Sequence, residues 1–178
     1  MKKIFTIFAL TATVILASCS KDPIGGTAVQ DMSGEWFLQV DVVDETGELL
    51  AEDIIGGHFI GLTFNVNSND PDMLYVSDNG GYFWDYKAQV PCDLKTLTFG
   101  AQDLEIPNEA YESNVMIWNG KITPGGAVTP SGGKADAIEY LISFDDDDAE
   151  YCTIYKVHGW RYTGFAADED GGAAPIQI

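Results

Sequence analysis

Apolar and polar residues alternate along much of the chain after Gly34, and a repeat of two residues is typical of β-strands that bury one face. Glycine, proline, asparagine and aspartate gather between these stretches, which indicates turns. Only residues 48–55 and 103–112 have room for a helical turn or two. The segments rich in β-branched and aromatic residues predict about eight strands: Glu35–Val43, His58–Val66, Met73–Val76, Tyr82–Val90, Thr96–Phe99, Asn114–Ile122, Ala137–Phe144 and Tyr151–Trp160.

An antiparallel meander of about eight strands must hide its two outer edges, either in two stacked sheets or in a closed barrel. Gly34 and Trp36 begin the first predicted strand, and Arg161, the single arginine of the chain, follows the last. A guanidinium over an indole face gains cation–π energy, and these two groups meet only if the first and last strands are neighbours. The alternative is a core tryptophan and an unrelated surface charge. We predict an all-β barrel that Gly34, Trp36 and Arg161 close.

The N-terminus has the composition of a lipoprotein signal peptide. Lys2 and Lys3 precede an apolar run, Ile4–Leu16, that is too short to span a bilayer. The residues up to Cys19, Leu-Ala-Ser-Cys, resemble the lipobox at which lipoprotein signal peptidase cuts once the cysteine is diacylated. We therefore expect Cys19 to become the acylated first residue of the mature protein.

Three segments follow from this pattern. Residues 1–18 are the expected signal peptide, residues 19–33 an acylated and flexible tether, and residues 34–178 a single barrel domain. The acyl chains would attach the protein to the outer membrane, on its cell-surface or its periplasmic face. The charged tag Ser20-Lys21-Asp22 resembles those that send some Gram-negative lipoproteins to the surface.

The charge balance excludes several partners. The chain has nine basic and 28 acidic residues, a formal net charge of −19. Loss of Lys2 and Lys3 with the leader leaves seven basic residues and a net charge of −21. Such a surface repels nucleic acid and anionic lipid head groups, so membrane attachment must come from the acyl chains. A neutral or cationic ligand fits this charge best, and a protein partner stays undefined.

Six stretches resemble a family of bacterial surface lipoproteins described as "putative lipid-binding hydrolases". The resemblance spans nearly all of the expected mature domain and implies a calycin or lipocalin-like barrel that binds lipid. It carries no catalytic motif that could be transferred residue by residue. The stretches are GEWFLQVDVV (34–43), YFWDYKAQV (82–90), LTFGAQD (97–103), WNGKI (118–122), IEYLISFDDDD (138–148) and YKVHGWRYTGF (155–165).

Aromatic residues are the candidate ligand-binding groups. By the period of two, Tyr82, Trp84 and Tyr86 share one face of a strand, while Trp118 and Tyr140 lie on two others. An eight-stranded barrel holds either packed side chains or one small ligand, and an aromatic lining suits a hydrophobic or lipid-like molecule. The alternatives are a filled core without a cavity, an outward aromatic stripe that stacks on sugars, and an accessory module of a membrane complex.

Catalysis has weaker support. The chain contains no G-x-S-x-G motif and, in the mature part, only two histidines, His58 and His158. A weak lipid or ester hydrolase therefore remains an alternative, without assigned catalytic residues, and no cofactor is expected. We interpret the carboxylates of Asp41, Asp85 and Glu139 as outward, solvated partners of apolar neighbours rather than a glycosidase pair.

Two further groups of residues could bind a metal ion or form a disulfide. Asp145, Asp146, Asp147 and Asp148 are a weak calcium candidate, because they lack the spacing that wraps a chain around the ion. A solvated turn between two strands is the simpler interpretation, and no other metal site is predicted. Cys92 and Cys152 could form a disulfide, but two separate buried thiols are the favoured interpretation, because each lies in an apolar, strand-like setting.

Overall fold

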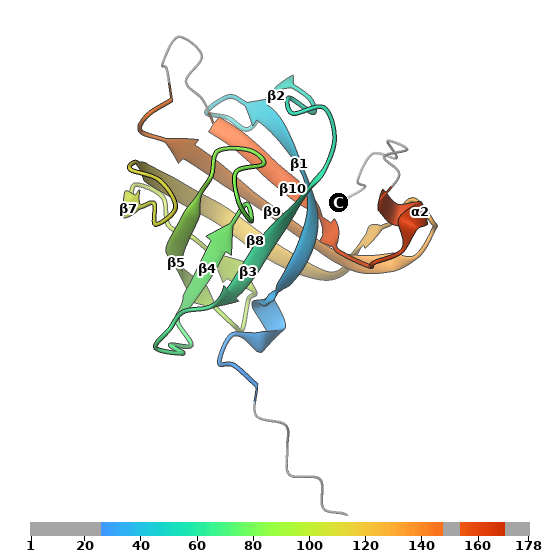
Figure 1. Cartoon of the computed structure of the whole chain (residues 1–178), viewed down its shortest axis with the longest axis horizontal. Helices are drawn as coiled ribbons and strands as arrows, with labels where there is room; N and C mark the ends of the chain where they lie inside the picture. Colours follow the sequence, from blue (N-terminus) through green and yellow to red (C-terminus); the bar gives the residue numbers. More distant parts are fainter. Residues whose placement is uncertain (1–25, 148–153, 170–178) are drawn as a thin grey trace, which may run out of the picture.

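The computed structural model of the chain describes residues 26–147 and 154–169, and its regular structure is nearly all β-strand (Figure 1). This confirms the predicted all-β class. Within the described residues, no helix is long and apolar enough to cross a membrane. The elements are η1 (Gln30–Met32), β1 (Gly34–Val43), β2 (Leu49–Ala51), β3 (Phe59–Asn65), β4 (Met73–Ser77), β5 (Lys87–Asp93), β6 (Thr98–Phe99), β7 (Ile106–Pro107), β8 (Asn114–Val128), β9 (Lys134–Phe144), β10 (Ile154–Arg161) and α2 (Ala166–Glu169).

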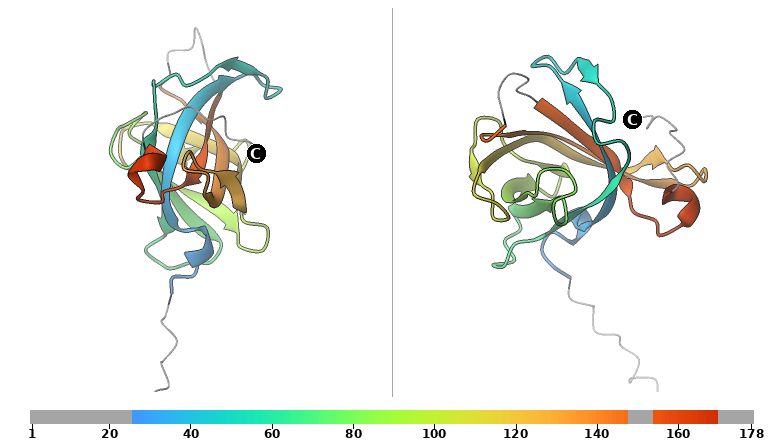
Figure 2. Two further views of the ribbon diagram at one scale, coloured as in Figure 1. Left: turned by 90° about the vertical axis from the view of Figure 1, so that its right-hand side faces the viewer. Right: turned by 45° about the horizontal axis from the view of Figure 1, so that its top comes forward.

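Eight of these strands form a closed antiparallel barrel. Each is hydrogen-bonded to the next in the order β1, β3, β4, β5, β6, β8, β9, β10, and β10 pairs with β1 to complete the ring (Figures 1 and 2). The join between β1 and β10 runs from Trp36 opposite Arg161 to Val43 opposite Ile154. β2 pairs with β1, and β7 with β8, outside this ring. The predicted meander closed into a barrel is confirmed.

Each predicted strand corresponds to one barrel strand, but several bounds differ. The prediction of a strand over Tyr82–Val90 was wrong in its first half, because residues 78–86 form a loop and β5 begins at Lys87. β8 continues to Val128 through register shifts after Trp118 and Thr123. Residues 48–55 and 103–112, which have room for a helical turn or two, form no helix; β2 and β7 in these segments pair with neighbouring strands.

Inward side chains from all eight barrel strands pack into one core cluster. The sequence left open whether the interior is packed or hollow. A water-sized void beside a side chain would appear as exposed surface, so the central layer of this barrel is filled. The central side chains with exposed fractions of 0–1% are Leu38, Val40, Leu74, Val76, Tyr86, Ala88, Val90, Val115, Ile117, Ile138, Tyr140, Ile142 and Val157.

Trp36 and Arg161 close one end of the barrel, which we call the base. The guanidinium carbon of Arg161 lies 4.4 Å from the centroid of the Trp36 ring, and the two residues are cross-strand partners. The Arg161 Nε–H donates to the Asp136 carboxylate at 3.0 Å. A Cβ at Gly34 would lie 2.1 Å from Arg161 Nη1, so the guanidinium occupies the space that a side chain would need. The predicted contact between the two ends of the domain is present.

The short helix η1 seals the base, where Trp36 is linked to it through Thr63 and Arg161 bonds the residue that follows it. The Trp36 indole N–H donates to the Thr63 hydroxyl at 2.7 Å, and this hydroxyl donates to the Met32 carbonyl at 2.6 Å. Arg161 Nη1 donates to the Ser33 carbonyl at 2.8 Å. Both side chains therefore fix the segment that leads into β1, and the chain enters the barrel from its base.

Candidate functional site

The loop between β4 and β5 folds around one buried carboxylate, that of Asp78. Its exposed fraction is 0%, and its two oxygens accept six backbone N–H bonds of 2.9–3.3 Å from within the loop. The turn needs left-handed backbone at four residues, of which Asn79 and Asp85 are not glycine. The donors are Gly80, Gly81, Phe83, Trp84, Asp85 and Tyr86.

This loop holds two aromatic rings over the end of the barrel opposite the base. The Trp84 ring stacks on Phe144 with centroids 4.6 Å apart and planes 10° from parallel. The Phe83 ring meets Tyr155 edge-on at 5.0 Å. We call Phe83, Trp84, Phe144 and Tyr155 the aromatic layer. Phe83 and Trp84 are half-buried and pack against the core cluster, so they extend its apolar surface toward solvent at this end.

Acidic side chains hold the outer edge of the aromatic layer. The Trp84 indole N–H donates to Asp146 at 3.1 Å, and the Tyr155 hydroxyl donates to Asp147 at 2.9 Å. Both aromatic rings thus present a polar edge outward and an apolar face inward. Two carboxylates, those of Asp146 and Asp147, therefore lie at the outer edge of this apolar surface.

A pair of tyrosines lies beneath the aromatic layer. The Tyr86 and Tyr140 hydroxyls are hydrogen-bonded to each other, and both side chains are at most 1% exposed. Burial raises the pKa of both phenols above the ordinary value, so they stay neutral. The Tyr86 ring also contacts Phe144 at a centroid distance of 5.8 Å. They place two neutral oxygen atoms among the apolar side chains of the core cluster.

The structure brings together three of the five residues predicted to bind a ligand. Trp84, Tyr86 and Tyr140 form a continuous set from the aromatic layer to the interior, linked through Phe144 and the tyrosine hydroxyl pair. Tyr82 is 65% exposed on the loop, so its predicted place on a strand face with Trp84 and Tyr86 was wrong. The cause is the Asp78 carboxylate, which draws this segment into a turn.

Trp118 is also not part of the interior set. It lies on β8 between Ile117, which belongs to the core cluster, and the register shift that follows. Its side chain is 9% exposed but does not belong to the core cluster. Alternation in the sequence showed that Trp118 shares a face with Met116, but not that this face is the outer one.

Sequence reasoning missed Asp78, Phe83 and Tyr155 as site residues. The run Ser-Asp-Asn-Gly-Gly at 77–81 signals a turn that starts at an aspartate, whose side chain commonly bonds backbone N–H groups just ahead of it. This signal indicated where the turn begins. It did not indicate that the same carboxylate reaches the amide of Tyr86, eight residues further on.

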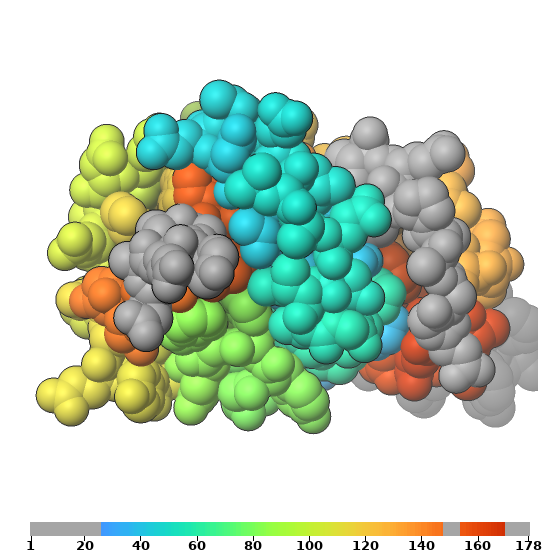
Figure 3. Space-filling view, turned by 90° about the horizontal axis from the view of Figure 1, so that it is seen from above, coloured from blue at the N-terminus to red at the C-terminus, as the bar shows by residue number. Residues whose placement is uncertain are grey.

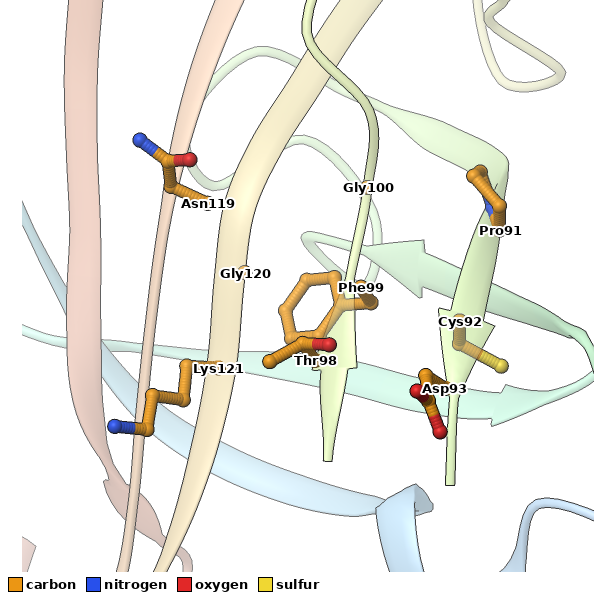
Figure 4. Close-up of a pocket in the computed structure, with 9 residues that line it drawn as sticks. All are labelled: Pro91, Cys92, Asp93, Thr98, Phe99, Gly100, Asn119, Gly120 and Lys121. Atoms are coloured by element: carbon orange, nitrogen blue, oxygen red, sulfur yellow. The ribbon is translucent and has the colours of Figure 1, made fainter. Parts of the chain in front are cut away.

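A groove of about 460 Å³ is lined by residues of β5, β6 and β8 and of the segments beside them (Figure 4). The Phe99 ring lies against the Gly120 backbone, where a Cβ would come within 2.4 Å of the ring. Burial raises the pKa of the Cys92 thiol to about 11, so this free thiol stays protonated and unreactive near neutral pH. The lining residues are Pro91, Cys92, Asp93, Thr98, Phe99, Gly100, Asn119, Gly120 and Lys121.

The histidines do not form a hydrolytic site in the described part of the chain. His158 Nε2 lies 2.8 Å from the Asp41 carboxylate on the outer face of β1 and β10, and Asp41 is 8% exposed, so it is not the solvated group we expected. His58 stacks on Phe37 at 4.6 Å, and burial lowers its pKa. Among the described residues, no serine hydroxyl is hydrogen-bonded to a histidine, which a serine nucleophile would need.

The aspartate run does not gather around one point. Asp145 accepts bonds from Asn114, whereas Asp146 and Asp147 bond to Trp84 and Tyr155 in the aromatic layer. No group of three or more ligating side chains that could hold a metal ion occurs among the described residues. The predictions for Cys19, Asp148 and Cys152 fall on residues outside the described ranges.

Fold and site together define a closed antiparallel β-barrel with a packed middle, a sealed base and an apolar, aromatic-covered end. Barrels of this size hold side chains or one small hydrophobic ligand. Residues 21–166 match the family described as "Lipid-binding putative hydrolase", and the chain belongs to this family. A comparison with curated proteins gives no match.

Proposed function

We propose that this protein is a lipoprotein of the cell envelope that binds a hydrophobic or lipid-like ligand beneath its aromatic layer. The observation that supports this most directly is the half-buried pair Phe83 and Trp84, which continues the apolar core to the surface. Membership of a lipid-binding family agrees with this role. The ligand would enter by displacing these two rings, because the central layer below is already filled.

The chemistry of the site favours a neutral or cationic ligand. Among the described residues no lysine or arginine is buried, so a carboxylate or phosphate taken into the interior would have no counter-charge. The hydroxyls of Tyr86 and Tyr140 offer hydrogen bonds to a ligand hydroxyl or carbonyl instead. Asp146 and Asp147 at the edge of the layer suit a head group that is neutral or positively charged.

Quenching of tryptophan fluorescence tests the binding site. We expect a lysophosphatidylcholine with a dibrominated acyl chain, below its micellar concentration, to quench the protein's fluorescence saturably. Because Trp84 lies in the aromatic layer, Trp84→Phe should remove most of this quenching. The matched control Trp118→Phe should keep it, since Trp118 is not part of the core cluster. Equal quenching in both variants, or none in the parent protein, would contradict the proposed site.

Membrane attachment is the second part of the proposal. The lipobox residues before Cys19 support acylation there, and anchoring in the outer membrane would follow, on its surface or periplasmic face. The family's calycin-type barrel would then stand at the end of a short tether. Mass spectrometry of the protein from membranes is expected to show a mature chain that begins at an acylated Cys19. A mature N-terminus at another residue, or one without acyl chains, would refute this part.

A further inference from the structure

Exposed apolar side chains gather at the end of the barrel that carries the aromatic layer. Three connections reach this end: residues 44–57, 78–86 and 101–113. Together with residues 145–147 we call them the rim, and Figure 3 looks onto this end, with the cyan-to-teal and green segments prominent. Within residues 26–147 and 154–169, eight large hydrophobic side chains are exposed, and six of them lie on the rim: Leu49, Leu50, Ile54, Tyr82, Leu104 and Tyr111.

The rim is also the most acidic part of the molecule. Its four segments contain fourteen of the 28 acidic residues and no lysine or arginine. Two lysines lie close to the rim, and both are paired: Lys87 at the start of β5 with Glu109 of the rim at 3.0 Å, and Lys156, which lines a cavity with Gly47, with Glu139 at 3.2 Å. Three other basic residues lie toward the base, Lys95, Lys134 and Arg161, and Lys121 lies midway along β8.

The rim is both apolar and acidic, and these two properties together exclude some of its possible partners. A second copy would bring an equally acidic rim, and an anionic bilayer would repel it, so neither suits an apolar contact here. The chain enters the barrel from the base, so its first described residues, such as Ala28, which bonds Asn69 there, lie at the end opposite the rim. A membrane that holds the N-terminus therefore does not need to meet the rim.

We propose that the rim docks a protein whose surface interleaves lysine or arginine with exposed apolar side chains. Leu50 and Tyr82, 62% and 65% exposed, would provide the buried contacts, and the acidic residues around them would steer the approach. A docked protein would cover the aromatic layer, where ligand enters or leaves under the proposed function. The docking itself does not depend on lipid binding and is measured separately from it.

An amphipathic peptide of lysine and leucine serves as the probe. Titrated into the ¹⁵N-labelled mature protein, it is expected to shift amide signals of the rim and to bind more weakly as salt rises. The variant Leu50→Ser with Tyr82→Ser should bind at least about tenfold more weakly. The matched control, Val128→Ser with Phe165→Ser, removes two equally exposed apolar side chains away from the rim and should bind as the parent does. Both variants keep the net charge.

The opposite results would overturn the proposal. Equal affinity of the two variants would mean that charge alone binds the peptide, without a docking surface. Amide shifts confined to the base would exclude the rim as the docking surface. Equal binding of a peptide of glutamate and leucine would exclude a role for the negative charge of the rim. Binding to phosphatidylcholine vesicles but not to the peptide would assign the rim to a lipid surface instead. The fluorescence quenching described above reports on the ligand site independently of each outcome.

Discussion

Replacing Trp36 with alanine is expected to lower the free energy of unfolding by about 3–5 kcal/mol, the usual cost of truncating a buried tryptophan. The Trp36 side chain is 0% exposed and bonds Thr63, and the Arg161 guanidinium covers its ring. The substitution leaves a cavity at the base and removes the bond that links β1 to η1 through Thr63. Urea unfolding followed by circular dichroism measures this loss.

The control for this prediction is Tyr82→Ala, because Tyr82 is an aromatic residue that is 65% exposed. Its truncation is expected to change stability by no more than about 0.5 kcal/mol, as is usual at the surface. If Trp36→Ala were as mild as Tyr82→Ala, the base would not contribute to the stability of the barrel.

A double-mutant cycle isolates the contact between the two ends of the domain. With Trp36→Leu and Arg161→Met as the single variants, we expect a coupling of about 1 kcal/mol, in the range for a cation–π pair that is partly removed from water. A cycle between Trp36 and Lys95, a basic residue outside the cation–π pair, should give no coupling. Coupling of equal size in both cycles would assign the effect to packing.

The closure of the barrel was predictable because few residues could make it. Arg161 is the single arginine, and Trp36 begins the first strand of the series, so a contact between them requires neighbouring first and last strands. Alternation then located all eight barrel strands, since each buries one face against the same core. These features depend on local patterns and on one long-range pair.

The content of the barrel was not predictable in the same way. Alternation shows which residues share a face, but it does not show how far opposite faces lie apart or whether their side chains meet. The interior contact of Tyr86 with Tyr140 joins residues of β9 and the loop before β5, a long way apart in sequence. Whether the central layer is filled depends on such three-dimensional contacts, so the sequence allowed both a packed and a hollow interior.

The loop around Asp78 shows a different limit. Tyr82, Trp84 and Tyr86 alternate as a strand would, and their aromatic side chains favour strands. Six N–H bonds to one carboxylate outweigh this preference, because each satisfies a backbone donor that a strand would have paired with a neighbour. Asp78, the residue that determines this conformation, lies before the aromatic residues, where the sequence equally fits an ordinary turn.

Replacing Asp78 with asparagine is expected to destabilise this loop strongly. Each Asp78 oxygen accepts three N–H bonds, and an amide group would turn three of these acceptor contacts into donor facing donor. Since a hydrogen bond to a charged group contributes about 1.5–3 kcal/mol, the loop should open with a loss of at least about 2 kcal/mol. Hydrogen exchange of the six loop amides measures this directly, and their protection should fall far more than that of β9.

The matched control is Asp85→Asn, which makes the same change of charge in the same loop. The Asp85 carboxylate accepts none of the six bonds, and asparagine suits the left-handed backbone of this residue, whose φ is 55°. Protection of the loop amides should therefore stay as in the parent protein. If both variants expose the amides equally, net charge and not the Asp78 carboxylate orders the loop. If neither does, the ring contacts of Phe83 and Trp84 and the bond from Trp84 to Asp146 hold the loop over the barrel without the Asp78 carboxylate.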